Sequence, residues 1–115
     1  MDLRKNIDDW LEERHPDHEF LLADGFEEAF IGVAYQFDSP LAVFDREKCI
    51  KILSRDMSLE EAEEYFQFNV EGAFMGPHTP MFLDRFKRNA TREEALEQYN
   101  NIKKNSKRNK KTNET

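Results

Sequence analysis

The residues of this sequence best suited to chemistry lie in one segment, 69–80, which reads NVEGAFMGPHTP. Glycine lets the backbone approach a ligand, exposed amides bind anions, and the segment adds an imidazole and a hydroxyl. Such a loop could hold a phosphate or a carbonyl group. It is not a nucleotide fingerprint, because neither GxxxxGK(S/T) nor GxGxxG occurs. The candidate ligand-binding or partner-binding residues are Asn69, Gly72, Gly76, His78 and Thr79, together with Asp45.

A structural interpretation of the same segment is simpler, and we favour it. Two glycines and two prolines can shape a turn from a helix into a strand. In this interpretation Asn69 caps the helix, and Gly72 takes the left-handed conformation that often follows a helix end.

Four carboxylates near an expected β-hairpin form a second candidate site: Asp24, Glu27, Glu28 and Asp45. Paired carboxylates can hold a metal ion or act as acid and base. The competing interpretation, which we favour, makes Asp24 a turn residue and Asp45 a helix cap. An enzyme that combines Asp24 and Asp45 with His78 is the weakest hypothesis, because nothing fixes the three within mutual reach.

Few other residues could bind a metal ion or act as nucleophiles. His15 and His18 lack a third ligand, and Pro16 breaks the helix that would align them. Cys49 is the only cysteine, and it sits in an apolar helical stripe as a small core residue does. We therefore predict no catalytic residue, no metal ion and no cofactor.

The charge of the chain is uneven. Residues 1–83 hold seven Lys or Arg and nineteen Asp or Glu, a net charge of −12, whereas residues 84–115 hold ten and five, a net charge of +5. The acidic helix expected over 58–71 could imitate nucleic acid, although a solvated helix face explains its glutamates as well. The basic tail, 103–115, could bind nucleic acid or simply aid solubility.

Hydrophobic spacing and capping residues predict an α+β fold, with a small antiparallel sheet packed against three to four helices. The sheet consists of a hairpin, which turns at 38–40, and one C-terminal strand. One face of the first strand should carry Ile31, Val33, Tyr35 and Phe37. The third helix, which starts at the capping box Ser58-Leu59-Glu60-Glu61, should bury Leu59, Ala62, Tyr65, Phe66 and Val70. The expected helices cover 2–14, the residues after Asp45, 58–71 and 91–102, and the expected strands cover 30–37, 41–44 and 81–83.

The chain should form one domain over 1–102, followed by a disordered basic tail over 103–115. No apolar run approaches the roughly 20 residues that span a bilayer, and no secretory signal opens the sequence. An acidic body also repels anionic lipid. We therefore expect a cytoplasmic protein that does not bind membranes.

Two segments show a resemblance to a known family. One is EAFIGVA at 28–34, followed by VFDREKCI at 43–50; the other is EAEEYFQFNV at 61–70, followed by GAFMG at 72–76, Thr79-Pro80 and Phe82. The chain resembles, over residues 22–83, a family of small uncharacterised proteins found mainly in bacteriophages and phage-like bacterial regions. The resemblance implies an accessory role in phage biology, inside a bacterial host cell, and implies no catalytic residues.

Together these observations predict a non-enzymatic acidic binding protein. As a phage accessory protein it would engage or inhibit a host macromolecule, such as a defence factor or a nucleic-acid-processing factor. A host protein is the expected partner, and Trp10, Phe26 and Phe68 should leave aromatic surface exposed for it. The alternative is a homo-oligomer that binds a nucleotide-like small ligand through the Gly72–Pro80 loop. Nucleic-acid binding by the basic tail is a further hypothesis.

Overall fold

The computed structural model describes residues 2–87 of the chain. Within these residues no helix is long and apolar enough to cross a membrane. The predicted helix over 91–102, the tail over 103–115 and the domain end at 102 lie outside the described residues. Residues 1–85 form one compact unit, and the second unit, 86–115, is described only at Phe86 and Lys87.

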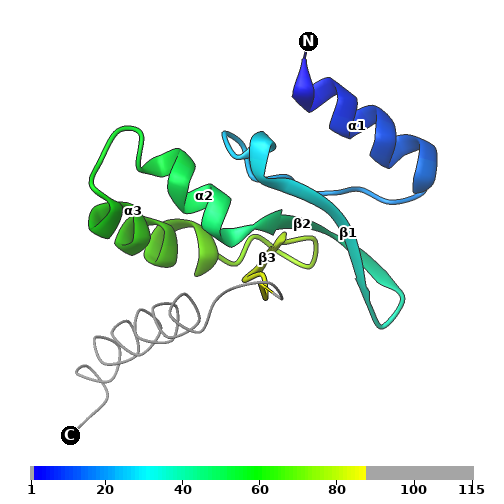
Figure 1. The fold of residues 1–115 in the computed structure, drawn as a ribbon. Helices are drawn as coiled ribbons and strands as arrows, with labels where there is room; N and C mark the ends of the chain where they lie inside the picture. Colours follow the sequence, from blue (N-terminus) through cyan, green and yellow to red (C-terminus); the bar gives the residue numbers. More distant parts are fainter. Residues whose placement is uncertain (1, 88–115) are drawn as a thin grey trace, which may run out of the picture. The chain divides into compact units, whose positions relative to one another are not determined.

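The predicted α+β fold is confirmed: helices combine with a small sheet made of a hairpin and one more strand (Figure 1). In chain order the elements are α1 (Leu3–Arg14), the 3₁₀ turn η1 (Glu27–Ala29), β1 (Phe30–Gln36), β2 (Ser39–Asp45), α2 (Arg46–Leu53), α3 (Leu59–Phe66), the π-helical turn η2 (Gln67–Glu71) and β3 (Met81–Leu83).

The three strands form one sheet in the order β1-β2-β3. β1 and β2 make the predicted antiparallel hairpin, which turns at Phe37 and Asp38 rather than at 38–40. β3 pairs with β2 in parallel, so the sheet is mixed rather than antiparallel throughout. The connection explains the difference: α2, α3 and η2 lie between β2 and β3, and a crossover of this length lets the two strands run in the same direction.

A β-bulge at Ile31 breaks the predicted alternation of β1. The residue pairs on either side of it show one extra residue in β1 relative to β2. Because of this insertion, Phe30 and Val33 both pack against the core, whereas Ile31 is 43% exposed. The prediction that Ile31 shares a face with Val33 is therefore wrong, and Phe37, assigned to the same face, lies in the turn after β1.

The three described α-helices start at their predicted caps. The side chains of Asp2, Asp45 and Ser58 each accept a hydrogen bond from the amide three residues further on, at 3.2, 3.3 and 3.2 Å. Ser58 also donates to the Glu61 carboxylate at 3.0 Å, which links the two ends of the predicted capping box. Local sequence therefore determines where these helices begin.

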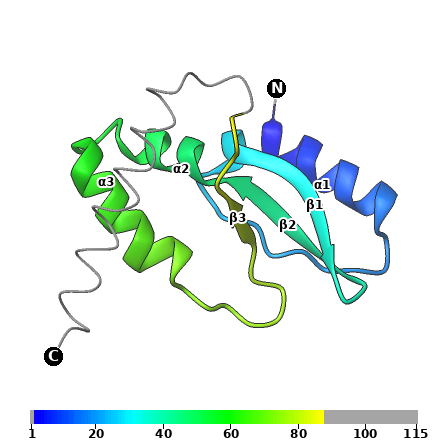
Figure 2. The ribbon, with the colours of Figure 1, turned by 60° about the horizontal axis from the view of Figure 1, so that its bottom comes forward.

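Aromatic rings form the centre of the core. Phe66 is fully buried and meets Phe26 and Phe82 edge-on, with ring centres 6.1 and 5.0 Å apart. Phe44, which is also fully buried, lies 6.1 Å from Phe82 and 5.6 Å from Phe30. These contacts connect α3 to all three strands and to Phe26, the residue just before η1. Figure 2 shows α2 and α3 gathered near the end of the sheet where β2 leads into α2. The prediction that Phe26 is exposed is wrong, since it is 8% exposed.

The third helix differs from its prediction at three residues. Leu59 and Tyr65, expected in the core, are 58% and 47% exposed. Gly72 has φ −83°, so it is not the predicted left-handed cap. Glycine is favoured there because of space: a Cβ on Gly72 would lie 3.0 Å from the Gln67 carbonyl oxygen. The helix ends in a wide π-helical turn whose backbone crowds the position where a side chain would begin.

Candidate functional site

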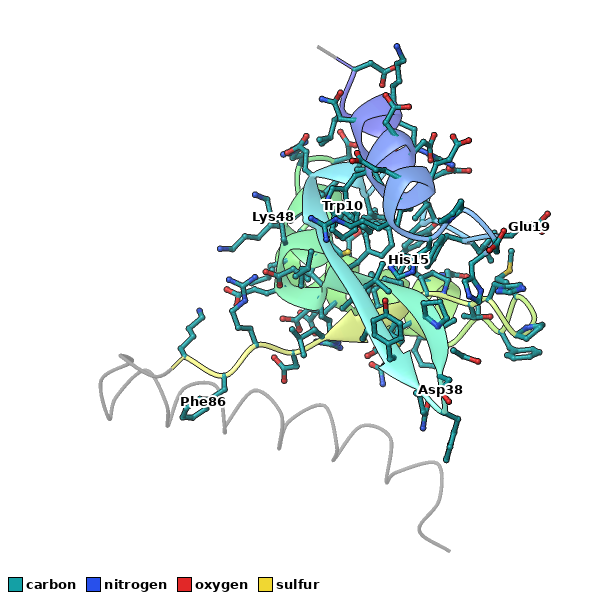
Figure 3. The ribbon with its side chains drawn as sticks, turned by 90° about the vertical axis from the view of Figure 1, so that its right-hand side faces the viewer. Trp10, His15, Glu19, Asp38, Lys48 and Phe86 are labelled. Carbon is teal, nitrogen blue, oxygen red and sulfur yellow. The ribbon has the colours of Figure 1, made fainter. Side chains whose placement is uncertain are left out.

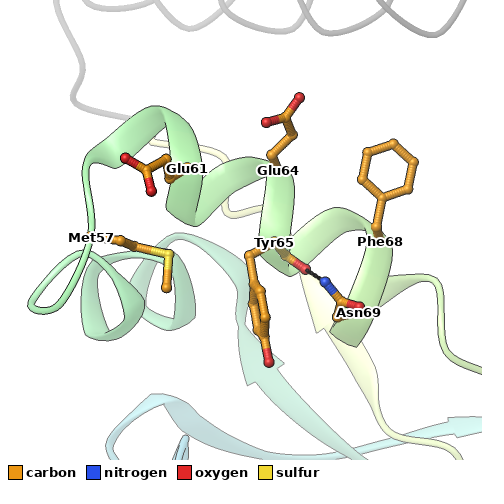
Figure 4. A pocket seen from close by; sticks show the side chains of 6 residues that line it. All are labelled: Met57, Glu61, Glu64, Tyr65, Phe68 and Asn69. Atoms are coloured by element: carbon orange, nitrogen blue, oxygen red, sulfur yellow. Dashed lines mark hydrogen bonds between the residues drawn. The ribbon is translucent and has the colours of Figure 1, made fainter.

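A shallow depression of about 410 Å³, wide open to solvent, follows α3 and η2 (Figure 4). We name it the α3 groove. It is lined by Met57, Glu61, Glu64, Tyr65, Phe68 and Asn69. Apolar, amide and acidic side chains therefore share one solvent-facing surface.

Helical spacing explains why aromatic side chains face outward here. Ala62 and Phe66 turn into the core and are fully buried. Tyr65 and Phe68 are three residues apart, so they are neighbours on the helix surface. They are 47% and 67% exposed, and their exposed ring area is available to a partner.

The π-helical turn η2 carries Phe68 and Asn69, which line one end of the α3 groove. The amide of Gly72 donates to the carbonyl of Gln67, five residues back, at 3.1 Å. A turn of this kind holds one residue more than an α-helical turn, and π-turns are frequent at functional sites. The side-chain amide of Asn69 donates to the Tyr65 carbonyl at 3.2 Å (Figure 4). Asn69, predicted as a cap or a ligand contact, thus stabilises the helix end and also lines the groove.

Both charged side chains that line the α3 groove, Glu61 and Glu64, are acidic. Residues 56–84 contain seven Asp or Glu and no Lys or Arg. Glu71 is held by Arg46, whose Nε and Nη2 donate to its two oxygens at 2.9 and 3.3 Å. Glu61 accepts the hydrogen bond from Ser58. The lining of the groove therefore combines aromatic rings with carboxylates.

The loop between η2 and β3 holds the predicted residues Gly76, His78 and Thr79. The Thr79 hydroxyl accepts a hydrogen bond from the Met75 amide at 2.8 Å and donates to the Gly76 carbonyl at 2.6 Å. Gly76 has φ 98°, a conformation that side chains disfavour. His78 is exposed to solvent. The Thr79 hydroxyl is therefore engaged inside the loop.

Replacement of Thr79 by valine is expected to lower the free energy of unfolding by about 1 kcal/mol. Valine keeps the shape of threonine but removes both hydroxyl hydrogen bonds, one of which satisfies the Met75 amide. Urea titration followed by circular dichroism measures the change. Thr79→Ser is the control, since it retains the hydroxyl and should lose less. Equal stability of the valine variant and the wild type would show that these bonds do not hold the loop.

Asp45 lies at the junction of β2 and α2, and both of its carboxylate oxygens have partners. One carboxylate oxygen accepts the hydrogen bond from the Lys48 amide at 3.3 Å, and the other lies 3.2 Å from Nη2 of Arg85. The Asp45 side chain is 17% exposed. These contacts agree with the helix-cap interpretation, and Asp45 does not line the α3 groove.

The other candidate carboxylates also have basic partners. Arg4 lies 2.6 Å from Asp24 and 3.7 Å from Glu27. Arg55 donates hydrogen bonds to both oxygens of Glu28, at 3.4 and 3.0 Å, and these bonds lower the pKa of the Glu28 carboxyl. Ion pairs and caps therefore account for the four carboxylates.

Nothing in residues 2–87 brings together three or more His, Cys, Asp or Glu side chains that could hold a metal ion. Trp10 of α1 and His15 at its end contact β1 (Figure 3): the ring centre of Trp10 is 6.1 Å from that of Phe30, and the Tyr35 hydroxyl is 3.0 Å from Nε2 of His15. Cys49 is fully buried, and burial raises the pKa of its thiol to about 12. The Cys49 thiol therefore stays protonated at neutral pH, as a core residue rather than a nucleophile.

Comparison with protein-family models, curated proteins and solved structures finds no match for this sequence. The function is therefore inferred from the surface of the molecule itself.

Sequence reasoning identified Phe68, Asn69 and the glutamates of the acidic helix, but it missed Met57 and Tyr65 as parts of the α3 groove. Tyr65 fits the apolar spacing of α3 and was therefore assigned to the core, although it is 47% exposed. The sequence pattern places Met57 in the connection between two helices, which gives no sign that it lines a surface depression. The absence of Lys and Arg over 56–84, which gives the surface one sign of charge, is a signal visible in the sequence. Trp10 is 37% exposed, in agreement with its prediction.

Proposed function

We propose that this protein is a non-enzymatic binding protein that engages a macromolecular partner through the α3 groove. The observation that supports this function is the exposed aromatic pair Tyr65 and Phe68, beside Met57, around an open groove. Tyrosine, phenylalanine and methionine are enriched at protein interfaces, where a few such side chains supply most of the binding energy. Neither ring belongs to the buried core cluster.

The charge of the groove favours a basic partner. A field of one sign attracts the opposite sign and repels nucleic acid and anionic lipid. Host proteins that process or defend against nucleic acid carry basic binding surfaces, and the resemblance of residues 22–83 to bacteriophage proteins points in the same direction. We therefore propose an accessory protein of a phage, which occupies such a surface in the cytoplasm of a bacterial host.

The alternative, an oligomer that binds a nucleotide-like ligand through the Gly72–Pro80 loop, has less support. The Thr79 hydroxyl is used inside that loop, and the loop lies in the acidic stretch 56–84, which disfavours phosphate.

Capture from a bacterial lysate tests the proposed function. The full chain is immobilised as wild type, as Phe68→Ala and as the matched control Phe74→Ala, in which a phenylalanine of 80% exposure is removed outside the α3 groove. Wild type and Phe74→Ala should retain the same protein in stoichiometric amount, and Phe68→Ala should lose it. Circular dichroism of each variant establishes that it is folded.

Two outcomes would reject the proposal. One is the absence of any stoichiometric partner under low-salt, detergent-free washing. The other is equal capture by the Phe68→Ala variant and the wild type, because binding would then not depend on the groove.

A further inference from the structure

The N-terminal helix α1 is held to the rest of the domain mainly by contacts near the surface. From its burial, its contacts and its connection we infer that α1 is a strap: it releases from η1 and β1 as a unit, while the sheet, α2 and α3 stay folded. Release uncovers the apolar surface on which α1 packs, so the helix controls access to that surface. This device involves none of the residues of the α3 groove.

The buried surface of α1 is small. Ile7 and Leu11 are the buried residues of this 12-residue helix, and Trp10 is 37% exposed. Ile7 and Leu11 are two of the 12 buried apolar side chains found in the described residues. Because the free energy gained by burial scales with apolar area, release of α1 costs only a fraction of complete unfolding. The ring contacts of Phe66 and Phe44 stay within residues 26–82, so they remain when α1 leaves.

Two polar contacts, which we name the latches, fasten the two ends of α1. Near its start, Nη1 of Arg4 lies 2.6 Å from Asp24 and 3.7 Å from Glu27. The Asp24 side chain is 85% exposed, and ion pairs of exposed groups add little stability because water screens them. Just after its last residue, Nε2 of His15 lies 3.0 Å from the hydroxyl of Tyr35, a residue that is 62% exposed. Water can replace the partner in both latches when they open.

The connection after α1 allows the helix to leave. Residues 16–19 are all exposed, and neither helix nor strand lies between α1 and η1. Further along, Leu22 and Phe26 are buried, so they anchor the rest of the connection in the core. Within residues 2–87 no backbone hydrogen bond joins α1 to the sheet. Residues 16–19 are therefore the hinge, and release of α1 breaks no strand pairing.

The length of α1 makes its release a single step. Isolated helices of about 12 residues are marginal in water, because the first turn is costly to form. α1 has 12 residues, and it contacts η1 more than any other helix or strand. Its helical structure therefore depends on this docking, and the amides of the whole helix should open together when it releases.

Native-state hydrogen exchange of the full chain tests the inference. Mass spectrometry follows the backbone amides of α1 and of β2, the central strand, at urea concentrations below the unfolding transition. The α1 amides should exchange at least about tenfold faster than those of β2. Their rate should also depend less on urea, since a small opening exposes little surface. Equal rates with equal urea dependence would overturn the inference, because α1 would then open only with the whole domain.

Paired variants test the two latches. Asp24→Asn removes the partner of Arg4 without altering α1, and Tyr35→Phe removes the hydroxyl but keeps the ring. Each should raise the exchange rate of the α1 amides about two- to fivefold and leave the β2 amides unchanged. Asp56→Asn and Tyr65→Phe are the controls, since they make the same changes at exposed residues between α2 and α3 and on α3. Neither control should change exchange in α1.

Three results with these variants would overturn the inference. Faster exchange of α1 and β2 together in the latch variants would mean that the whole domain is destabilised. Unchanged exchange of α1 in both latch variants would mean that these contacts do not hold the helix. An equal response to the latch variants and to their controls would mean that the effect does not arise where α1 docks.

Discussion

The Phe66→Ala variant is expected to lose about 3–5 kcal/mol of the free energy of unfolding, a large share of the roughly 5–15 kcal/mol typical of a domain. The Phe66 side chain is fully buried, with ring contacts to Phe26 and Phe82. The guanidinium of Arg46 lies 5.8 Å from the Phe66 ring centre. Removal of the ring would leave a cavity where α3 meets η1 and β3, and the surrounding elements could close it only in part.

Urea titration of Phe66→Ala against Phe68→Ala measures this effect with a matched control. The two variants make the same chemical change two positions apart, but Phe68 is 67% exposed. Phe68→Ala should stay within about 0.5 kcal/mol of the wild type, as surface substitutions usually do. Similar losses in both variants would contradict the assignment of Phe66 to the core and Phe68 to the surface.

The parts of the fold that sequence predicts well are those that neighbouring residues determine. A cap and the amide three residues further on lie in the same turn, so Asp2, Asp45 and Ser58 fix their helix starts wherever the helices pack. The hairpin is similar, since its two strands are joined by a two-residue turn. The α+β class follows from these local signals.

The features that sequence missed depend on distant residues. The direction of β3 is set by the path of the long crossover from β2, and a β-strand pattern contains no information about the direction of its partner. The bulge at Ile31 adjusts β1 to β2 so that Phe30 and Val33 both reach the core. The same limit applies to the α3 groove, because helical spacing alone does not reveal that Tyr65 lies beside the buried face rather than within it.

A double variant of the hairpin turn, Phe37→Asn with Asp38→Gly, is expected to raise the free energy of unfolding by about 1–2 kcal/mol. Phe37 and Asp38 have φ 51° and 63° and join paired residues Gln36 and Ser39, which makes a two-residue turn of type I′. Left-handed backbone is unfavourable for a residue as bulky as phenylalanine, and asparagine followed by glycine suits this turn best. Thermal unfolding should show a higher midpoint, by roughly 4–8 °C for each kcal/mol.

The single variant Phe37→Ala separates the two properties of this residue, its backbone conformation and its ring. The ring is 93% exposed, so its removal should cost little, and alanine retains an unfavourable left-handed backbone. Phe37→Ala should therefore unfold near the wild-type midpoint, well below the double variant. A large loss in Phe37→Ala would show that the ring packs against the fold, and an unchanged midpoint in the double variant would show that the turn is not strained. If both expectations hold, Phe37 lowers the stability of the hairpin in which it lies, and stability alone would not account for a phenylalanine at that turn.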